Sequence, residues 1–175
     1  ESYLSFTFTP NNCADNTAAG AVLCDSNFIR TAHSVIRNFR IIGPGNERLE
    51  DIQDYNVLYE IFRAMQVSGD YQTSTEGIKA GYGLSMTNAT SYNFTIHPLS
   101  GLFLSDKYIP VGFLREPLVL EIDLEITHRV LQNPVLVPAT ATTYLTAGDY
   151  TISNVEFHAM ILDMGPTYED QFKRM

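Results

Sequence analysis

Tryptophan is absent from this sequence, cysteine occurs only twice, and no apolar run approaches the ~18 residues that a helix needs to span a bilayer. Two cysteines are too few for a disulfide framework or a zinc site, so we expect Cys13 and Cys24 to be thiols, with a loop-closing disulfide as the less favoured alternative. We expect no membrane span. The sequence opens at Glu1 without a signal-peptide pattern, which suggests a processed product or an excised domain.

Positive charge is also scarce in this chain. Eleven Lys and Arg residues face 20 Asp and Glu residues, for a formal net charge of −9 at pH 7. Proteins that wrap DNA or RNA neutralise phosphates with clustered Lys and Arg, so we expect no direct nucleic-acid binding. The 175 residues, 45% of them apolar and 18% charged, fit a single globular domain over residues 1–175 with a sizeable core.

The motifs that mark common catalytic sites are missing too. The sequence has no G-x-S-x-G nucleophile elbow, no P-loop and no G-x-G-x-x-G phosphate turn. Its four histidines are isolated, and none stands in an H-x-H or H-E-x-x-H spacing: His33, His97, His128 and His158. We therefore expect no enzymatic activity, no cofactor and no catalytic metal.

The clearest secondary-structure signal is the stretch 117–126, PLVLEIDLEI, in which apolar and acidic residues alternate. Side chains of a strand point to opposite faces in turn, so this pattern predicts a strand with a buried even face and an acidic, solvated odd face. The odd face carries Glu121, Asp123 and Glu125. Such carboxylates can hold calcium or act as an acid/base pair, but a solvated or subunit-facing stripe is the favoured interpretation because charged residues are rarely buried.

Other segments also alternate. We expect a strand over 2–10 that ends at Pro10, a loop over 11–27, and a strand over 34–42 followed by a Gly-Pro-Gly-Asn turn at 43–46. Alternation returns over 84–99, where Tyr92, Phe94 and Ile96 lie opposite Asn93, Thr95 and His97. In the last strand, 150–163, the apolar phase shifts near Ser153 and Asn154, which predicts a bulge there.

One substantial helix interrupts the strands, predicted at about 49–66 from a helical stripe formed by Ile52, Tyr55, Tyr59 and Phe62. We expect a mobile loop over 67–83 and, after Pro166, a short C-terminal helix over 168–175. Six to eight strands without a βαβ rhythm indicate an all-β fold, and we expect a jelly-roll β-sandwich with the one inserted helix in preference to an up-and-down barrel.

Three segments together resemble the major capsid proteins of double-jelly-roll DNA viruses, among them polinton-like viruses, adintoviruses and virophages. The first combines Leu49-Glu50-Asp51-Ile52 with Tyr55-Asn56, and the second combines Leu99-Ser100-Gly101 with Tyr108-Ile109-Pro110 and Gly112 before the alternating strand. The third is the last strand, YTISNVEFHAMILDM. The series covers most of the chain from Ser34 onward.

The resemblance implies a virion protein without catalysis, assembled inside the host cell into trimers of pseudo-sixfold outline that build an icosahedral shell. Members of this family carry two jelly rolls in one chain, whereas 175 residues have room for one, which resembles the first. A second jelly roll in the same precursor is one expectation, and a single-jelly-roll relative is the other.

Alternatives remain open at this point. A single-jelly-roll penton or minor capsid protein is the nearest one. A carbohydrate-binding jelly roll would gather Tyr92, Glu121 and Asp123 in one exposed groove, and a cupin-like enzyme is disfavoured by the scattered histidines.

For the capsid hypothesis we predict a contact surface on the helix. Tyr and Arg most often anchor protein interfaces, so Tyr55, Tyr59, Phe62 and Arg63 are the expected contact residues, with the loop after the helix ordering when the contact forms.

Overall fold

The computed structural model describes residues 2–17, 20–23, 25–66, 74–105, 109–132, 147–163 and 165. Nine strands cover much of this part of the chain: β1 (Tyr3–Thr17), β2 (Gly20–Leu23), β3 (Asn27–Phe28), β4 (Ile36–Ile42), β5 (Arg48–Ile52), β6 (Tyr92–Ile96), β7 (Val119–Leu124), β8 (Leu131–Gln132) and β9 (Ala147–His158). The α-helices are α1 (Tyr55–Gln66), α2 (Thr75–Lys79) and α3 (Thr127–Val130), and the short 3₁₀ helices are η1 (Ala32–Val35), η2 (Pro44–Asn46) and η4 (Val111–Phe113). The fold is therefore all-β, as the alternation predicts.

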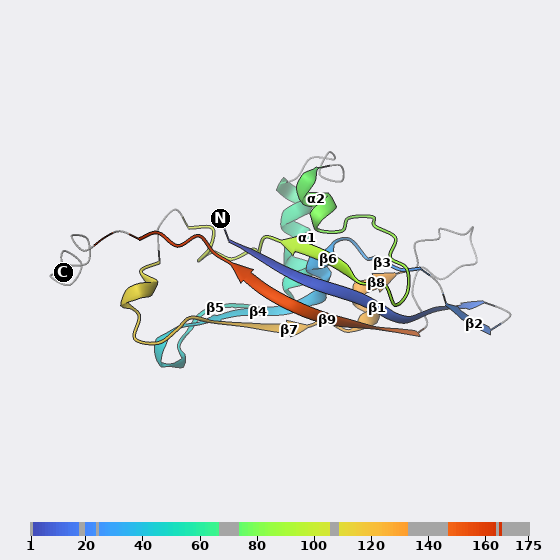
Figure 1. The fold of residues 1–175 in the computed structure, drawn as a ribbon, viewed down its shortest axis with the longest axis horizontal. Helices are drawn as coiled ribbons and strands as arrows, with labels where there is room; N and C mark the ends of the chain where they lie inside the picture. Colours follow the sequence, from blue (N-terminus) through green and yellow to red (C-terminus); the bar gives the residue numbers. More distant parts are fainter. Residues whose placement is uncertain are drawn as a thin grey trace.

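Two antiparallel sheets form the body of the molecule. In the first, β1 pairs with β9 along one edge and with β6 and then β2 along the other. In the second, β4 lies between β5 and β7, and β3 and β8 form a separate short pair. In Figure 1, β1 and β9 run side by side, and α1 and α2 stand above the strands.

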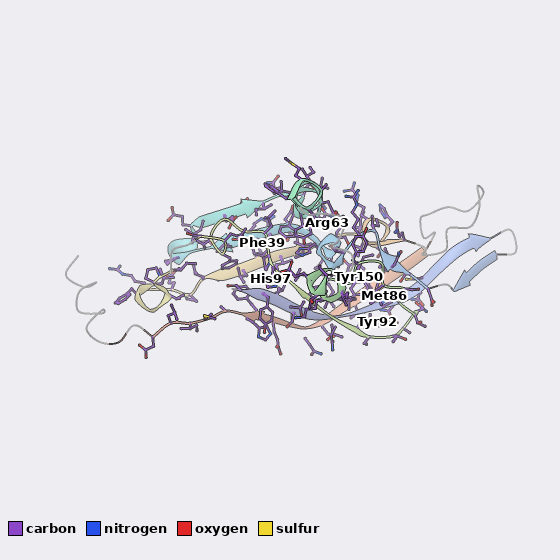
Figure 2. The ribbon with its side chains drawn as sticks, turned by 90° about the horizontal axis from the view of Figure 1, so that it is seen from above. Phe39, Arg63, Met86, Tyr92, His97 and Tyr150 are labelled. Carbon is purple, nitrogen blue, oxygen red and sulfur yellow. The ribbon has the colours of Figure 1, made fainter. Side chains whose placement is uncertain are left out.

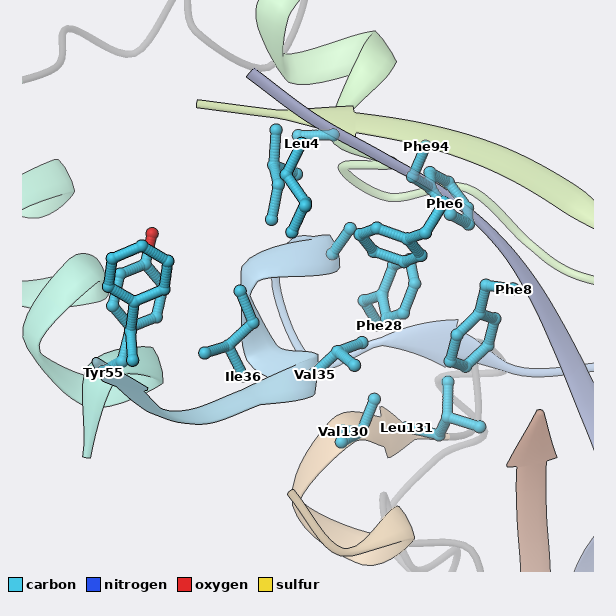
Figure 3. Close-up of a cluster of buried hydrophobic side chains, with 14 of the residues drawn as sticks. Leu4, Phe6, Phe8, Phe28, Val35, Ile36, Tyr55, Phe94, Val130 and Leu131 are labelled. Atoms are coloured by element: carbon cyan, nitrogen blue, oxygen red, sulfur yellow. The ribbon is translucent and has the colours of Figure 1, made fainter. Parts of the chain in front are cut away.

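The core is built from the alternating apolar faces of these strands. Leu4, Phe6 and Phe8 of β1 are buried and meet apolar side chains from both sheets and from the loops between them (Figure 3). The Phe28 ring lies 4.9 Å from the Phe8 ring and 4.9 Å from the Phe94 ring, centroid to centroid. Burying a Phe side chain fully stabilises the fold by about 1.5–3 kcal/mol, so this aromatic cluster is a major source of stability.

The burial predicted for residues 117–126 matches the structure in the middle of this stretch and differs from it at the C-terminal end. Leu120 and Ile122 pack against the core, but Leu124 and Ile126 are 51% and 49% exposed, whereas Glu125 is only 4% exposed. The pairing of β4 with β7 is shifted by one residue at Arg37, opposite the end of β7. The strand ends at Leu124, so the two-residue period no longer controls which side chains are buried.

The helix is shorter than predicted. Residues 48–52 form β5, in which Ile52 pairs with Phe39 and Glu50 pairs with Ile41 of β4, and α1 begins only at Tyr55. Glu50 accepts hydrogen bonds from Ser100 and Gly101 in the loop after β6, and Asp51 forms an ion pair with Arg40 of β4. Pairing with β4 therefore overrides the helical spacing that begins at Ile52.

Strand β1 continues through Pro10 instead of ending there. Pro10 pairs with Tyr150 of β9, and its carbonyl accepts a hydrogen bond from Ala89 N (2.7 Å) on the opposite edge. On that edge, the last residue of β1 that pairs with β6 is Phe8, opposite Tyr92. Pro10 lies beyond this pairing, so its missing N–H interrupts no hydrogen-bond ladder there. The predicted loop over 11–27 instead contains the end of β1, its hairpin partner β2, and the first residue of β3.

The predicted bulge in the last strand is confirmed. Ser5 pairs with Glu156 but Thr7 pairs with Ser153, so β9 has one extra residue between them, and Asn154 adopts a positive φ of 49°. The 43–46 turn is confirmed as well, as η2.

Some predictions fall wholly or partly outside the described residues. Of the predicted loop 67–83, residues 67–73 lie outside, and 75–79 form helix α2, capped by the Ser74 hydroxyl, which accepts from Gly77 N (3.1 Å). Cys24 and residues 168–175 of the predicted terminal helix also lie outside. Among the helices that are described, none combines the length and the apolar character needed to cross a membrane.

Candidate interaction surface and adjoining cavity

The inner face of α1 is anchored within the chain. Tyr55 has no exposed surface, its hydroxyl accepts a hydrogen bond from Leu99 N (2.9 Å), and it lies 3.0 Å from Nδ1 of His33. The Tyr59 ring stacks on the His33 ring with a centroid distance of 3.5 Å and an angle of 12°. Tyr55 was predicted to contact a partner, but its side chain is buried within the chain. It is therefore not part of the contact surface.

Arg63 and Phe62 lie at the border of this face. The Arg63 side chain is 16% exposed, with one guanidinium nitrogen 2.9 Å from a Glu60 oxygen and the guanidinium carbon 5.3 Å from the centre of the Tyr82 ring. Phe62 is 40% exposed. Of the predicted contact residues, Phe62 alone presents a large apolar surface to solvent.

The opposite face of α1 is an exposed apolar stripe, which we call the α1 stripe: Val57, Ile61, Ala64 and Met65. Val57, Ile61 and Met65 follow one another at four-residue intervals and are 56%, 52% and 79% exposed. Residues with that spacing lie one above the other on a helix. The sequence contained this signal, but it was missed because a helix with two apolar faces does not by itself reveal which one the fold covers.

The charges beside the α1 stripe are unusual for an acidic chain. Glu60 is held by two arginines: Arg30 at 3.1 Å and Arg63 at 2.9 Å. This cluster carries one more positive than negative charge, although the net charge of the chain is −9. Figure 2 labels Arg63 next to α1.

A second exposed apolar patch, which we call the β9 end, consists of Val155, Phe157, Met160, Ile161 and Leu162. Met160 and Ile161 are 74% and 81% exposed, whereas the Phe157 ring contacts the Phe103 ring at a centroid distance of 5.1 Å. Glu156 and Asp163 flank the patch with exposed carboxyl groups. Figures 1 and 2 both place the β9 end away from α1.

Two carboxylates of the predicted acidic stripe on β7 form ion pairs with an arginine of β4. Arg40 on β4 contacts Asp51 (3.3 Å), Glu121 (3.0 Å) and Asp123 (2.8 Å), and so ties β5, β4 and β7 together. A hydrogen bond from Asn38 is the largest cause of the lowered pKa of Asp123, opposed by partial burial and reinforced by Arg40. These carboxylates thus take part in a cross-strand ion network, and no group of three or more His, Cys, Asp or Glu placed to hold a metal ion occurs in the described part of the chain.

Glu125, predicted in the same stripe, points elsewhere. Its carboxylate accepts hydrogen bonds from Asn56 (3.1 Å) and from Ile126 N (3.0 Å), and Arg129 lies 3.8 Å away. The Tyr150 hydroxyl donates to the Glu125 backbone carbonyl, and burial, followed by the charge of Glu125, raises the pKa of Tyr150 to about 12. Glu125 therefore connects α1 to the region after β7.

Two of the resemblance segments contact each other directly. Glu50 accepts hydrogen bonds from the Ser100 hydroxyl (2.5 Å) and from Gly101 N (2.8 Å), while Tyr55 accepts from Leu99 N. The Leu99-Ser100-Gly101 segment is thus fastened to the Glu50–Tyr55 segment at three consecutive residues. These residues therefore have a structural role within the chain, in which they hold the two segments together.

The groove expected of a carbohydrate-binding module is not formed by its expected residues. Tyr92 belongs to β6 in the first sheet, where its hydroxyl accepts from Thr87 N (2.9 Å), whereas Glu121 and Asp123 belong to β7 in the second sheet. The three side chains are therefore not brought together.

A cavity of about 300 Å³ opens beside α1 and α2. It is lined by His33, Tyr59, Thr75, Glu76, Lys79, Ala80, Thr95, Ile96 and His97. His33 is 2% exposed, and burial, followed by the nearby charges of His97 and Arg63, lowers its pKa to about 3. The imidazole is therefore neutral at physiological pH.

No protein family, curated protein or solved structure matches this chain. The resemblance to capsid proteins therefore stays a prediction.

Proposed function

We propose that this chain is a jelly-roll domain of a viral major capsid protein, which assembles with copies of itself into capsomers of an icosahedral shell. The observation that carries the proposal is the α1 stripe. A helix with one face packed in the core and an apolar opposite face left in solvent is typical of an element that a partner covers.

A second copy of the same chain fits the charges around this surface. Copies with a net charge of −9 repel one another across most of their surfaces. We expect this repulsion to be weaker beside the α1 stripe, where Arg30 and Arg63 accompany Glu60. The β9 end, flanked by Glu156 and Asp163, supplies an apolar patch with the complementary charge.

A contact between two different patches is heterologous, so each copy uses its α1 stripe on one neighbour and its β9 end on the other. Contacts of this kind close into rings when the rotation between copies allows it. A ring of three is the trimer that the resemblance to double-jelly-roll capsid proteins implies. The charged groups of the Arg40 network and the residues of the Glu50–Ser100 contact are all engaged in interactions within the chain. Such interactions stabilise the fold, as expected of a structural protein.

Size-exclusion chromatography with light scattering tests the proposal. At micromolar concentration we expect a mass about three times the 19.6 kDa of one chain. A mass of 19.6 kDa at every concentration would contradict self-assembly of this chain.

A further inference from the structure

The hydrogen-bond partners of the Tyr55 hydroxyl assign the tautomer of His33. The Tyr55 hydroxyl already accepts from Leu99 N, so its single proton is available to His33 Nδ1, which lies 3.0 Å away. With Tyr55 fully buried, this arrangement satisfies both its donor and its acceptor. The neutral imidazole then carries its own proton on Nε2, and Nε2 is a donor.

That donor is available to a ligand. His33 lines the 300 Å³ cavity, and one side of its ring is covered by Tyr59, with a centroid distance of 3.5 Å. Among the described contacts, the imidazole makes one hydrogen bond, through Nδ1 to Tyr55. Nε2 is not one of the fully buried polar atoms that lack a partner in the described part of the chain, so the cavity gives it access to an acceptor from outside the chain.

The other groups around the cavity are rich in donors. Lys79 supplies an ammonium group, and Thr75 and Thr95 supply hydroxyls. His97 Nδ1 lies 3.2 Å from the Ser2 carbonyl oxygen, which can only accept, so the proton on this nitrogen is already used within the chain. Glu76 is the one carboxylate in the lining, in a chain that has 20 acidic residues against 11 basic ones.

We propose that this cavity binds a small oxyanion, a carboxylate or phosphate group, which accepts hydrogen bonds from His33 Nε2 and Lys79. An oxyanion has several acceptor lone pairs and no need of a donor, which matches the lining better than a cation does. Hydrogen bonds between charged donors and anions are stronger than those between neutral groups, so Lys79 supplies most of the affinity and His33 the orientation. The site is independent of the α1 stripe.

Nuclear magnetic resonance of the histidine ring nitrogens of the whole chain tests this site. Sodium phosphate and sodium acetate are titrated separately, with sodium chloride at equal ionic strength as the control. We expect the free protein to show the proton on His33 Nε2, and one of the two oxyanions to shift that resonance in a saturable way. Saturation by phosphate alone identifies a phosphate site, and saturation by acetate identifies a carboxylate site.

Two variants make the test specific. Lys79→Gln should weaken binding about tenfold, since a hydrogen bond to a charged group is lost. Arg115→Gln removes one exposed positive charge away from the cavity lining and should leave the affinity unchanged. A proton on His33 Nδ1, an unsaturable shift equal to that with chloride, or equal weakening in both variants would each overturn the proposal.

Discussion

The Ser100 hydroxyl donates a hydrogen bond of 2.5 Å to the Glu50 carboxylate, and thereby joins the loop after β6 to strand β5. The same carboxylate accepts from Gly101 N and Leu102 N, at 2.8 and 3.4 Å. Ser100 is 1% exposed, so this contact replaces water at a site that the solvent does not reach. Fifty residues separate the two partners in the sequence, so the pair fixes a long-range feature of the fold.

Replacing Glu50 with Ala should lower the free energy of unfolding by about 1.5–3 kcal/mol, because hydrogen bonds to a charged acceptor are lost and buried donors are left without a partner. Denaturant unfolding followed by circular dichroism measures the change. Glu47→Ala is the matched control, since Glu47 is exposed, and its effect should stay within about 0.5 kcal/mol. Equal effects of the two substitutions would show that the Glu50 contacts contribute nothing.

The burial along β7 leads to a second prediction. Ile122 packs against the core while Leu124, two residues later, is 51% exposed. Ile122→Ala should lower the free energy of unfolding by about 1–3 kcal/mol, below the full range for a completely buried site, and Leu124→Ala by less than about 1 kcal/mol. If Leu124→Ala is the more destabilising of the two in a monomeric sample, the assigned register of β7 is wrong.

His33 makes the stability depend on pH. Its folded pKa of about 3 lies below the ordinary value of 6.5, so between these values the unfolded chain binds a proton that the native chain does not. Stability therefore falls as pH decreases below 6.5, by about 1.4 kcal/mol per pH unit, or about 2 kcal/mol between pH 6.5 and pH 5. The groups that face the imidazole and oppose its protonation are His97 and Arg63.

The variant His33→Asn tests this dependence, because its amide oxygen can still accept from Tyr55 but it does not titrate. We expect a weaker decrease of stability from pH 6.5 to pH 5 in this variant than in the wild type. The exposed His128, replaced by Gln, serves as the control and should leave the slope unchanged. An unchanged slope in His33→Asn would mean that His33 takes up its proton at the same pH in the folded and the unfolded chain.

The sequence was most informative where local alternation alone decides the structure. The strands around Phe6, Phe94 and Ile122 and the bulge at Asn154 were all visible as two-residue periods or as a break in them. The interior of a strand repeats one simple geometry, so its pattern survives in the sequence.

Features that depend on distant partners could not be predicted in this way. The segment 49–52 has helical spacing, yet it is a strand because β4 pairs with it, and Glu125 is buried because Asn56 of α1 reaches it. Tyr55 was assigned to the surface because a helical stripe does not show how deeply it is buried. The cavity beside His33 depends on residues from β6, α1 and α2 and leaves no pattern in any one of them.

Tyr59 and Arg63 are less suitable than expected for testing assembly. Tyr59 stacks on His33 and Arg63 binds Glu60, so Tyr59→Ala with Arg63→Ala would disturb the fold as well as any contact. The α1 stripe offers a cleaner test, because Ile61 and Met65 are exposed and their loss leaves the core intact.

Sedimentation velocity at micromolar concentration, on the wild type and the double variant Ile61→Ser with Met65→Ser, tests the central claim most directly. The control is Ile78→Ser with Leu84→Ser, which removes two exposed apolar side chains outside α1. We predict a trimer for the wild type and the control, and a monomer with unchanged circular dichroism for the α1 variant. Assembly of the α1 variant at the same concentration as the wild type would contradict the account.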